Sequence, residues 1–360
     1  MIPEFDDLFG RSPCLALDIG GTLTKVVCLL PTELGSCCSD IEDRDAPTIP
    51  VETLTEAIAS SYGTHIAPGG LVVKTYTFTS TQIPSLITNL RRILKNCSGM
   101  NPRVRVTGGG AQNYAQLICD RLETSIHKIE EMQSLIKGLS FALRLPGACF
   151  QFELASESIR TVSCGCDIYP RLLVNIGSGV SIIRMDSPTQ YERISGTALG
   201  GGTALGLAYL LLGCTSFDEL IELSITGQAS NVDLSVGSIM GLDVDQGQSF
   251  LSRDTLASSL GKVTQDFASA FPLRRDDLAQ SIIRMISYNI GYVAHLVARS
   301  QGVTTLFFSG KFVHRHLPTL QAISYAIDFY RRNWCEDASF DVFFLQHEGY
   351  IGALGALLST

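Results

Sequence analysis

The sequence predicts an α/β fold of two domains, and three features support this prediction. Strand-like and helix-like segments alternate along both halves of the chain, which is typical of sheets flanked by helices. A chain of 360 residues is too long for one ordinary core, so two domains of roughly 150 to 200 residues are expected. One pattern, an apolar strand followed by a glycine turn and a second strand, occurs twice about half a chain apart. Two similar domains that face each other across a cleft are therefore predicted.

The repeated pattern covers Cys14 to Leu29 (CLALDIGGTLTKVVCL) and Arg171 to Met185 (RLLVNIGSGVSIIRM). Each copy predicts a buried strand, a tight glycine turn and a returning antiparallel strand. A duplicated β-hairpin with glycine turns is typical of the actin-like (ribonuclease H-like) ATPase fold. We expect an N-terminal actin-like domain over residues 1–165 and a C-terminal actin-like domain over residues 166–360.

The remaining elements follow from apolar periodicity and from turn residues. In the first half we expect strands at 71–79, 103–107 and 149–153, and helices at 83–94, 111–122 and 128–143. In the second half we expect helices at 203–212, 217–224, 276–298, 317–331 and 349–358, and strands at 304–308 and 340–345. Two stretches rich in Ser, Asp, Gly or Pro, at 33–51 and 228–251, are predicted to be surface loops.

Composition argues against several classes of function. Apolar residues make up 45% of the chain, charged residues only 17%, and glycine occurs 33 times, which together describe a compact α/β enzyme. The formal net charge of −8 disfavours nucleic acid as a partner, because phosphate binding needs a basic patch. The longest apolar stretch, residues 199–213, is too short for a membrane span.

The cysteines and the first residues predict a cytoplasmic protein. Eleven cysteines show no regular framework, which suits a reduced cytosolic protein. Cys164 and Cys166 form a lone C-x-C that lacks the second half of a zinc site, so we expect buried or loop thiols there. Glu4, Asp6 and Asp7 open the chain with acidic residues, unlike a signal or transit peptide.

The first glycine turn, Asp18 to Thr22 (DIGGT), can hold a phosphate and a metal ion. Its acid ends a predicted strand, where it can bind Mg²⁺ directly or through water, while glycine amides and a threonine hydroxyl meet phosphate oxygens. A plain structural hairpin is the alternative. The candidates at this turn are Asp18, which is also the metal candidate, Gly20, Gly21, Thr22 and Lys25; the lysine is as well explained by a solvated strand position.

Three further glycine turns each lie between a predicted strand and a predicted helix, where backbone amides favour an anion. Each is also explained as a structural loop or cap. Their presence in both halves of the chain favours a nucleotide bound between the domains. The residues expected to contact it are Gly108, Gly109, Gly110, Gly201, Gly202, Thr203, Gly310 and Lys311.

The second hairpin turn, Asn175 to Gly179, has a neutral amide and a hydroxyl in place of the acid. It suits contact with phosphate or with polar groups of a second substrate, and a hairpin with a polar face is the alternative. Ser178, Gly179 and Ser181 are the candidates, because Ser181 lies two residues along the returning strand and can face the same cleft.

Two charged residues are candidates for the chemistry itself. Glu131 is followed at i+4 by Leu135 and at i+8 by Leu139, so it begins an apolar helix face and should point inward. An inward carboxylate is costly unless it is used or paired, which suggests a general base; a helix-start acid favoured by the dipole is the alternative. Arg193 precedes the Gly200 turn and can bind a carboxylate or a transferring phosphate, although a surface strand arginine is also possible.

Several stretches together resemble the eukaryotic-type (type II) pantothenate kinases. LLVNIGSGVSII (172–183), ERISGTALGGGTALGL (192–207) and LQHEGYIGALGALL (345–358) carry the most specific match. LALDIGGTLTKVV, TGGGA (107–111) and HKIEEMQSLIKGL (127–139) resemble the same family, so the likeness runs along nearly the whole chain in order.

The resemblance implies transfer of the γ-phosphate of ATP to pantothenate, which gives 4′-phosphopantothenate at the first step of coenzyme A synthesis. It also implies dependence on Mg²⁺, a homodimer, and inhibition by coenzyme A or acyl-CoA. By position, Glu131 matches the family's catalytic base, and Ser178, Ser181 and Arg193 match its contacts to pantothenate or acyl-CoA. Both the glutamate and the arginine are present, which favours a working enzyme.

The chain departs from the family pattern at three places, which affects regulation and nucleotide affinity more than the reaction. The segment before Arg171 is shorter than usual. The stretch from Ala257 to Lys262 resembles a substrate-side segment, with Ala257 as the contact and lysine in place of asparagine at its end. Lys311 also replaces an asparagine expected beside the adenosine.

Two other functions fit the same fold. A sugar or N-acetylhexosamine kinase would use an aspartate base and sugar-binding clusters of Asn, Asp and Glu, which the sequence does not offer. A catalytically silent sensor of nucleotide or acyl-CoA belongs to another class, and turnover with ATP and pantothenate distinguishes it from the kinase.

Overall fold

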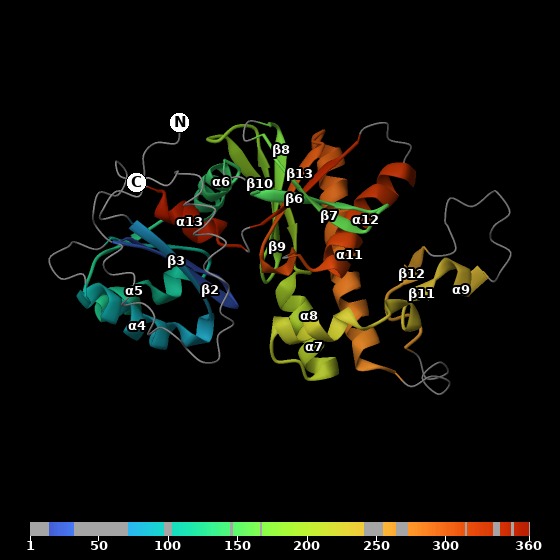
Figure 1. Cartoon of the computed structure of the whole chain (residues 1–360), viewed down its shortest axis with the longest axis horizontal. Helices are drawn as coiled ribbons and strands as arrows, with labels where there is room; N and C mark the ends of the chain where they lie inside the picture. Colours follow the sequence, from blue (N-terminus) through green and yellow to red (C-terminus); the bar gives the residue numbers. More distant parts are fainter. Residues whose placement is uncertain are drawn as a thin grey trace.

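The computed structural model describes residues 14–31, 71–96, 103–144, 147–165, 168–240, 255–263, 273–313, 315–333, 339–346 and 349–359. Two β-sheets with helices packed on them lie side by side (Figure 1), which confirms the predicted α/β class. The loop predicted at 33–51 lies outside the described residues. Each sheet ends in turns that form the candidate site.

The first sheet has five strands in the order β3-β2-β1-β4-β5. β1 and β2 form the predicted antiparallel hairpin, which places Asp18 opposite Lys25. β4 runs parallel to β1, so Thr107 lies beside Asp18 and the turns after both strands leave the same edge of the sheet. The strands are β1 (Cys14–Ile19), β2 (Leu23–Pro31), β3 (Leu71–Thr79), β4 (Arg103–Thr107) and β5 (Ile126–Lys128).

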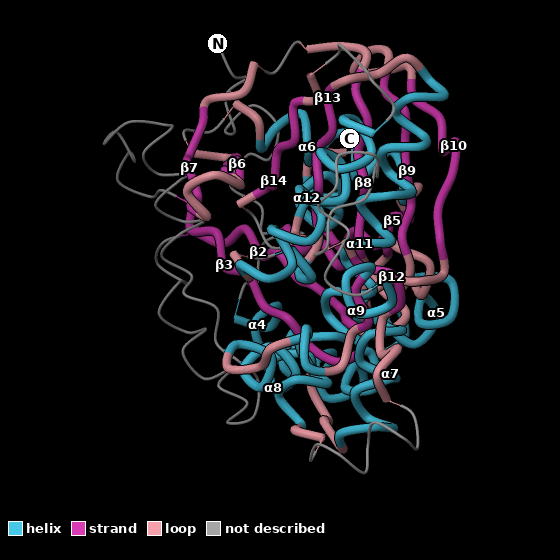
Figure 2. The backbone as a smooth tube through the Cα atoms, turned by 90° about the vertical axis from the view of Figure 1, so that its right-hand side faces the viewer, coloured by secondary structure: helices cyan, strands magenta, loops and turns pink. Residues whose placement is uncertain are grey.

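The second sheet has seven strands in the order β10-β9-β8-β13-β14-β6-β7. β8 and β9 form the second antiparallel hairpin, and β13 runs parallel to β8, which repeats the arrangement of the first sheet. Figure 2 shows β8, β9 and β10 side by side. The strands are β6 (Cys149–Glu153), β7 (Ser158–Val162), β8 (Arg171–Ile176), β9 (Val180–Met185), β10 (Tyr191–Thr197), β13 (Thr305–Ser309) and β14 (Asp341–Leu345).

The helices form a separate apolar core with each sheet. On the first sheet they are α4 (Ile83–Asn96) and α5 (Ala111–Leu122), preceded by η2 (Ser80–Gln82). On the second sheet they are α7 (Gly201–Leu212), α8 (Phe217–Ile225), α11 (Arg275–Gln301) and α12 (Leu317–Asn333), with the short η5 (Lys311–Val313). Strand β5 was not predicted: the helix expected at 128–143 included its last residue, Lys128, and no element was assigned to its first two.

The segment predicted as a loop at 228–251 is partly regular in its described residues. It contains η3 (Ala229–Asn231), β11 (Leu234–Ser235) and α9 (Val236–Met240), and β11 pairs with β12 (Leu256–Ser258). Hydrogen bonds to other parts of the chain order it. Asp233 Oδ1 accepts one from the amide of Leu260, just after β12, at 2.9 Å. Asp277 at the start of α11 accepts one from the amide of Gln228 at 2.7 Å. The loop prediction is wrong here, because polar residues found partners in distant parts of the chain.

Two helices, α6 (Glu131–Ala142) and α13 (Ile351–Leu357), lie between the sheets in Figure 1 and cross at glycines. A Cβ atom on Gly138 would lie 1.9 Å from the carbonyl oxygen of Ile351, and a Cβ on Gly355 would lie 1.7 Å from that of Ser134. Only glycine permits this approach. α13 follows the second sheet in sequence yet packs on α6 and on β1 of the first sheet.

The division at residues 165 and 166 remains a prediction. Strands β6 and β7 precede it in sequence but pair within the second sheet, and α13 returns to the first. Any division of this chain by sheets would therefore join segments that are distant in sequence.

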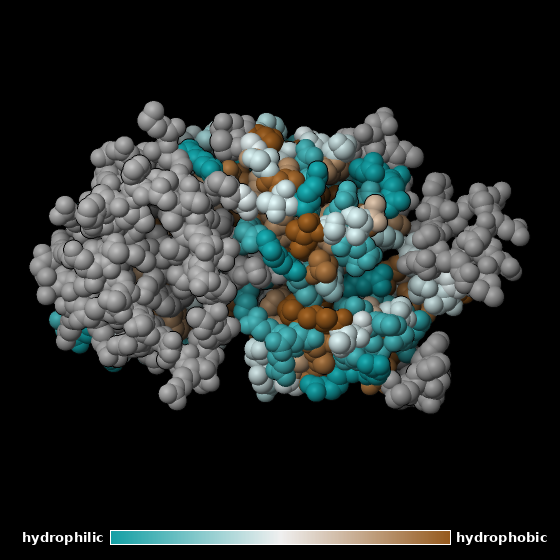
Figure 3. Space-filling model, in the orientation of Figure 1, coloured by the Kyte–Doolittle hydropathy of each residue, from teal (hydrophilic) through white to brown (hydrophobic). Residues whose placement is uncertain are grey.

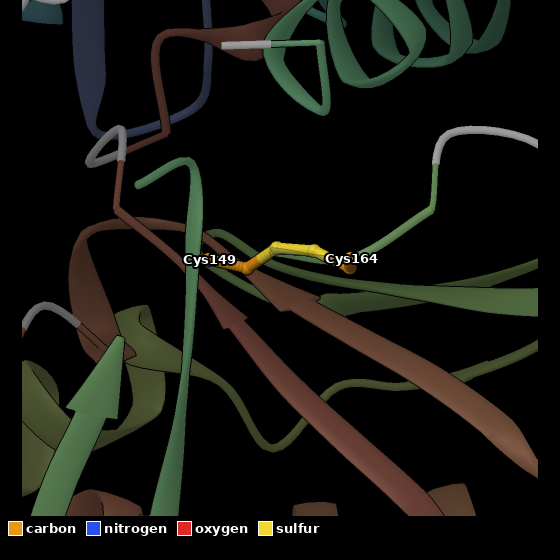
Figure 4. Close-up of a disulfide and its surroundings, with 2 residues drawn as sticks. All are labelled: Cys149 and Cys164. Atoms are coloured by element: carbon orange, nitrogen blue, oxygen red, sulfur yellow. A yellow bond between two sulfur atoms is a disulfide. The ribbon is translucent and has the colours of Figure 1, made fainter. Parts of the chain in front are cut away.

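Cys149 and Cys164 form a disulfide between the first residue of β6 and the segment after β7 (Figure 4). The expectation of a buried or loop thiol at Cys164 is therefore wrong. Pairing of β6 with β7 places Cys149 opposite Val162, which brings a cysteine two residues further along into reach. A bond that closes a loop over a separation of 15 residues contributes on the order of 3 kcal/mol to stability.

Apolar surface gathers over α7 and α8 on the face shown in Figure 3. α7 is apolar on all sides, and its Tyr209, Leu210 and Leu211 are 61%, 77% and 53% exposed. Among the described residues, we find no single helix with the length and hydropathy to cross a membrane. The bent pair α7 and α8, at 70° to each other, meets that test only as a pair.

Candidate active site

Six glycine turns from both sheets meet in one place, and we call them the glycine-turn cluster. The amide of Gly110 donates a hydrogen bond to Ile19 O at 2.8 Å, and the amide of Gly201 donates one to Gly177 O at 2.9 Å. The Cα of Gly310 is 3.2 Å from the position of a Cβ on Gly349. The cluster consists of 20–22, 108–110, 177–179, 200–202, Gly310 and 349–352.

Two of these glycines have backbone conformations that other residues rarely adopt. Gly108 has φ +88°, and a Cβ there would lie 2.5 Å from Asp18 Oδ1; Gly310 has φ +115°, and a Cβ there would lie 2.0 Å from Ile176 O. Both positions therefore need glycine for its conformation and for its size. These contacts hold the turn after β4 on β1 and the turn after β13 on β8.

The Asp18 carboxylate is enclosed between two of the turns. Its Oδ1 lies against Gly108, and its Oδ2 is 2.4 Å from where a Cβ on Gly352 would be. Burial raises the pKa of Asp18, and the nearby positive charge of Lys25 acts in the opposite direction. Lys25 is held by the strand pairing of the hairpin, and its Nζ is 2.7 Å from the Cβ position of Gly349.

The two hairpin turns touch through their hydroxyl groups. Thr22 Oγ1 and Ser178 Oγ are 2.8 Å apart and share a hydrogen bond, although they are 156 residues apart in sequence. Both residues are exposed. The structure thus brings together a nucleotide candidate from the first sheet and a substrate candidate from the second.

Glu131 is the first residue of α6 and is exposed, so the expectation that it turns away from solvent is wrong. The predicted helix face is nevertheless correct, because Leu135 and Leu139 on it are buried. Glu131 lies one helical turn before the buried part of that face, and its side chain is directed at the glycine turn 108–110 of the cluster. Its Oε2 is 3.9 Å from the Cβ position of Gly109.

The environment of Glu131 favours its protonated form. Partial withdrawal of the carboxylate from water raises its pKa most, and the negative charges of Asp18 and Glu130 raise it further. Arg193 and Lys25 are close enough to act in the opposite direction. Because the residue as a whole stays in contact with water, this withdrawal of the carboxylate from water is incomplete.

Glu130 has a different position from its neighbour. It is the N-cap of α6, and its side chain accepts hydrogen bonds from the amides of Met132 at 3.0 Å and Gln133 at 2.7 Å. Two of the free amides at the helix start are thereby satisfied. Of this acidic pair, Glu130 stabilises the helix and Glu131 remains available at the cluster.

Arg193 is presented by an irregularity in β10. The pairing of β10 with β9 shifts register between Arg193 and Ser195, as at a β-bulge, and bulges redirect side chains. Arg193 Nε donates a hydrogen bond to Ser181 Oγ at 3.3 Å, and the absence of a side chain at Gly196 leaves room for the guanidinium, whose NH2 is 2.8 Å from that Cβ position. Arg193 and Ser181 are therefore brought together as the sequence predicted.

Three further nucleotide candidates, Gly202, Thr203 and Lys311, lie at or next to the cluster. Gly202 and Thr203 start α7 at the cluster, with the amide of Gly202 bound to Ser178 O at 3.0 Å and Thr203 Oγ1 bound to Ala198 O at 2.8 Å. Lys311 follows Gly310, but its Nζ forms an ion pair with Asp218 Oδ2 at 2.8 Å. The positive charge of Lys311, which the sequence suggested for contact with a nucleotide, is therefore paired with Asp218 instead.

Ala257 is not brought to the cluster within this chain. It lies in β12, beside β11 and α9 at the far right of Figure 1, and is exposed. Lys262 at the end of the same segment donates a hydrogen bond from Nζ to Ser230 O at 2.7 Å, so it stabilises the local fold.

Asp18 suits a magnesium ion but not a metal held by the protein alone. Among the residues that the structure describes, no group of three His, Cys, Asp or Glu side chains is placed to hold a metal. Mg²⁺ usually keeps several waters and is bound through one or two carboxylates together with the phosphates of a nucleotide. One enclosed carboxylate beside glycine turns that are expected to bind phosphate therefore fits this ion.

The sequence did not select the glycines of the last turn as site residues. Gly349 lies against Lys25, and Gly352 lies against Asp18. The i, i+3 spacing of Gly349, Gly352 and Gly355 in HEGYIGALGALL is a signal that could have identified them, since it predicts one helix side without side chains.

Two sheets of like topology, each with a hairpin whose glycine turn enters one cluster, define an actin-like ATPase fold. A solved structure supports this class: the activator of 2-hydroxyisocaproyl-CoA dehydratase from Clostridium difficile, solved with bound ADPNP. It superposes with a TM-score of 0.50 at 15% identity, over 96% of this chain and 93% of that chain. At this identity the likeness concerns the fold.

The chain belongs to the Fumble family, whose family model matches residues 14–359. Pantothenate kinase 1 of Arabidopsis thaliana is 38% identical over 355 residues, which cover 96% of this chain and 85% of that protein. Pantothenate kinase 2 of Arabidopsis thaliana is 42% identical over 257 residues, 71% of this chain but 28% of that protein. Against rice pantothenate kinase 1, at 36% identity, the chain spans 47% of the relative's length. The resemblance to type II pantothenate kinases is thus confirmed at the level of family.

Proposed function

We propose that this protein transfers the γ-phosphate of ATP to pantothenate and so makes 4′-phosphopantothenate, the first step of coenzyme A synthesis. The observation that carries the proposal is the meeting of Glu131, Asp18, Lys25 and Arg193 at the glycine-turn cluster of a Fumble-family chain. A carboxylate, a metal-binding acid and two cations are the groups that phosphoryl transfer to a hydroxyl needs.

In this proposal the glycine turns hold the phosphates of ATP. The amides and small residues at Gly20, Gly21, Thr22 and 108–110 would contact phosphate oxygens, with Gly201, Gly202 and Thr203 at the start of α7 and Gly310 completing the nucleotide site. Asp18 would hold Mg²⁺, which when bound neutralises phosphate charge. Lys25 would add a second positive charge beside it.

The acceptor would be fixed by the second sheet. Arg193 can bind the pantothenate carboxylate or the transferring phosphate through two parallel N–H groups, and Ser178, Gly179 and Ser181 offer polar contacts beside it. Glu131 would take the proton from the primary hydroxyl of pantothenate as that oxygen bonds to the γ-phosphorus and the bond from this phosphorus to ADP breaks, which releases ADP. Its raised pKa brings it closer to the range in which a general base is efficient.

An ADP-release assay with ATP, Mg²⁺ and a panel of acceptors tests the proposal. Pantothenate should be turned over, whereas glucose and N-acetylglucosamine should not. Turnover of a sugar alone would establish the sugar kinase instead, and no turnover with any acceptor, together with binding of acyl-CoA, would establish a silent sensor.

We propose further that an acyl-CoA inhibits the enzyme by competing with ATP, which rests on family resemblance. A ligand that binds only the folded state raises the melting temperature. Saturating acetyl-CoA should therefore raise Tm and raise the apparent KM for ATP. Inhibition that leaves the KM for ATP unchanged, or no shift in Tm, would refute this proposal.

A homodimer is the proposed assembly, with α11 at its interface. An aromatic surface supports it: Tyr288 and Tyr292 of α11 pack against Tyr330 of α12, at ring distances of 6.2 and 4.2 Å, and all three are half-buried. In such a dimer the partner's β12 segment would be one source for the contact expected from Ala257. A sedimentation measurement that gives the mass of one chain at micromolar concentration would contradict it.

The cytoplasm is the proposed compartment, on the basis of composition. The disulfide between Cys149 and Cys164 argues the other way, because such bonds persist mainly in oxidising compartments. Imaging of the tagged full-length protein together with free-thiol counting in cell extracts decides between them.

A further inference from the structure

One glycine outside the predicted phosphate turns is in contact with the enclosed carboxylate of Asp18. A Cβ on Gly352 would lie 2.4 Å from Asp18 Oδ2 and 2.9 Å from its Cγ. The opposite side of the same carboxylate is closed by the main chain around Gly108, where a Cβ would be 2.5 Å from Oδ1. Asp18 is thus held from two sides by backbone, which leaves it one position.

Gly352 cannot move away from Asp18, because α13 is anchored on three sides. Gly355 is in backbone contact with Ser134 of α6, and Tyr350 Oη shares a hydrogen bond of 2.6 Å with Thr77 Oγ1 of β3. At the other end, the buried Arg105 of β4 donates a hydrogen bond to Leu357 O. A cation at the C-terminal end of a helix is favoured by the dipole.

The same helix also fixes α6, which carries Glu131. The approach of Gly138 to Ile351 O at the start of α13 leaves no space for relative sliding of the two helices. The separation between Asp18 on β1 and Glu131 on α6 is therefore set through one short helix that touches both.

We propose that Gly352 is a positioning residue, which holds the Asp18 carboxylate in place relative to Glu131 through α13. The inference rests on the proposed kinase function for its catalytic consequence but not for its structural one. A methyl group at position 352 has to displace the carboxylate or the helix by about 1 Å, since C···O contacts are normally well above 3 Å. A displacement of that size at a reacting centre typically costs about 10²-fold in rate.

The direct test is Gly352→Ala, with Gly206→Ala as the matched control. Gly206 lies in α7, and a Cβ there would meet nothing within 4 Å. We expect Gly352→Ala to lower kcat about 10²-fold and to raise the Mg²⁺ concentration that gives half-maximal rate, because Asp18 is displaced. Gly206→Ala should keep the wild-type values of both.

A second measurement needs no substrate and separates contact with Asp18 from general damage to the helix. In the wild-type background, Gly352→Ala should lower Tm by several degrees. Asp18→Ser removes the carboxylate that the new methyl group meets, so the double variant should melt only slightly below Asp18→Ser alone. Gly355→Ala, which meets the backbone of Ser134, should lower Tm equally in both backgrounds.

The effect of Asp18→Ser on the Tm loss of Gly352→Ala would remain measurable even if pantothenate proved not to be the substrate. If Asp18→Ser does not relieve the loss of Tm in Gly352→Ala, the contact is not the cause and the proposal is overturned. It is also overturned if Gly352→Ala retains the kcat and the Mg²⁺ dependence of Gly206→Ala.

Discussion

Glu131→Gln is expected to lower kcat for pantothenate by a factor of at least about 10². Removal of a general base typically costs about 10² to 10⁴ in rate, or roughly 3 to 5 kcal/mol of barrier. Glutamine keeps the size and one oxygen of the side chain but cannot accept the proton of the acceptor hydroxyl. The groups proposed to bind ATP lie on other turns, so the variant should bind ATP with Mg²⁺ as the wild type does. Single-turnover and nucleotide-binding measurements on the folded variant separate the two effects.

Glu130→Gln is the matched control. Its carboxylate caps α6 through the amides of Met132 and Gln133, and a glutamine retains one acceptor oxygen for them. We expect kcat within a few-fold of wild type and a small loss of Tm. If Glu130→Gln abolished turnover while Glu131→Gln kept it, the assignment of the base would be wrong even for a proven kinase.

The pH dependence should reflect the same residue. The pKa of Glu131 is raised above the usual range for a glutamate, and a base acts only when deprotonated. kcat should therefore fall as pH decreases through that raised pKa, and this acidic limb should lie at higher pH than an unperturbed glutamate would give. Two results would contradict the assignment. One is an acidic limb at the pH expected of an ordinary glutamate; the other is an acidic limb that stays unchanged when Glu131 is substituted and the variant keeps measurable activity.

Arg193→Lys is expected to lose most of kcat/KM for pantothenate, by about 10²-fold. A guanidinium offers two parallel N–H groups to a carboxylate or phosphate, and lysine has a single ammonium that cannot reproduce this geometry. Lysine also cannot reach Ser181 Oγ from the same backbone position with the same direction as the Nε donor, which is 3.3 Å away in the structure. Steady-state kinetics with varied pantothenate measure the loss.

Arg184→Lys is a suitable control, because Arg184 is on the adjacent strand β9 and binds Asp186 at 2.9 Å, away from the cluster. Its substitution should leave kcat/KM within a few-fold of wild type. Wild-type kinetics for Arg193→Lys would show that the arginine is a surface residue of β10 and would remove it from the proposed site.

The sequence by itself predicted the parts of the site that depend on local patterns. The two hairpins and the strand-to-helix glycine turns at 107–111 and 200–203 are encoded by apolar runs and by glycine, which act over a few residues. Residue patterns made Glu131, Arg193 and Ser181 candidates, and family resemblance gave them their particular roles. The structure confirms the hairpins and shows Arg193 hydrogen-bonded to Ser181, and the catalytic roles remain predictions.

Tertiary structure alone decided how these parts meet. The hydrogen bond between Thr22 and Ser178, the ion pair of Lys311 with Asp218, the disulfide of Cys149 and the contact of Gly352 with Asp18 join residues that are 15 to 334 positions apart. No periodicity in the sequence reports such contacts, because they depend on where the two sheets and α13 come to rest after packing. The exposure of Glu131 also depends on tertiary structure. The helix pattern predicts the face of α6 on which Glu131 lies, whereas the packing of the neighbouring glycine turns decides how much water reaches its side chain.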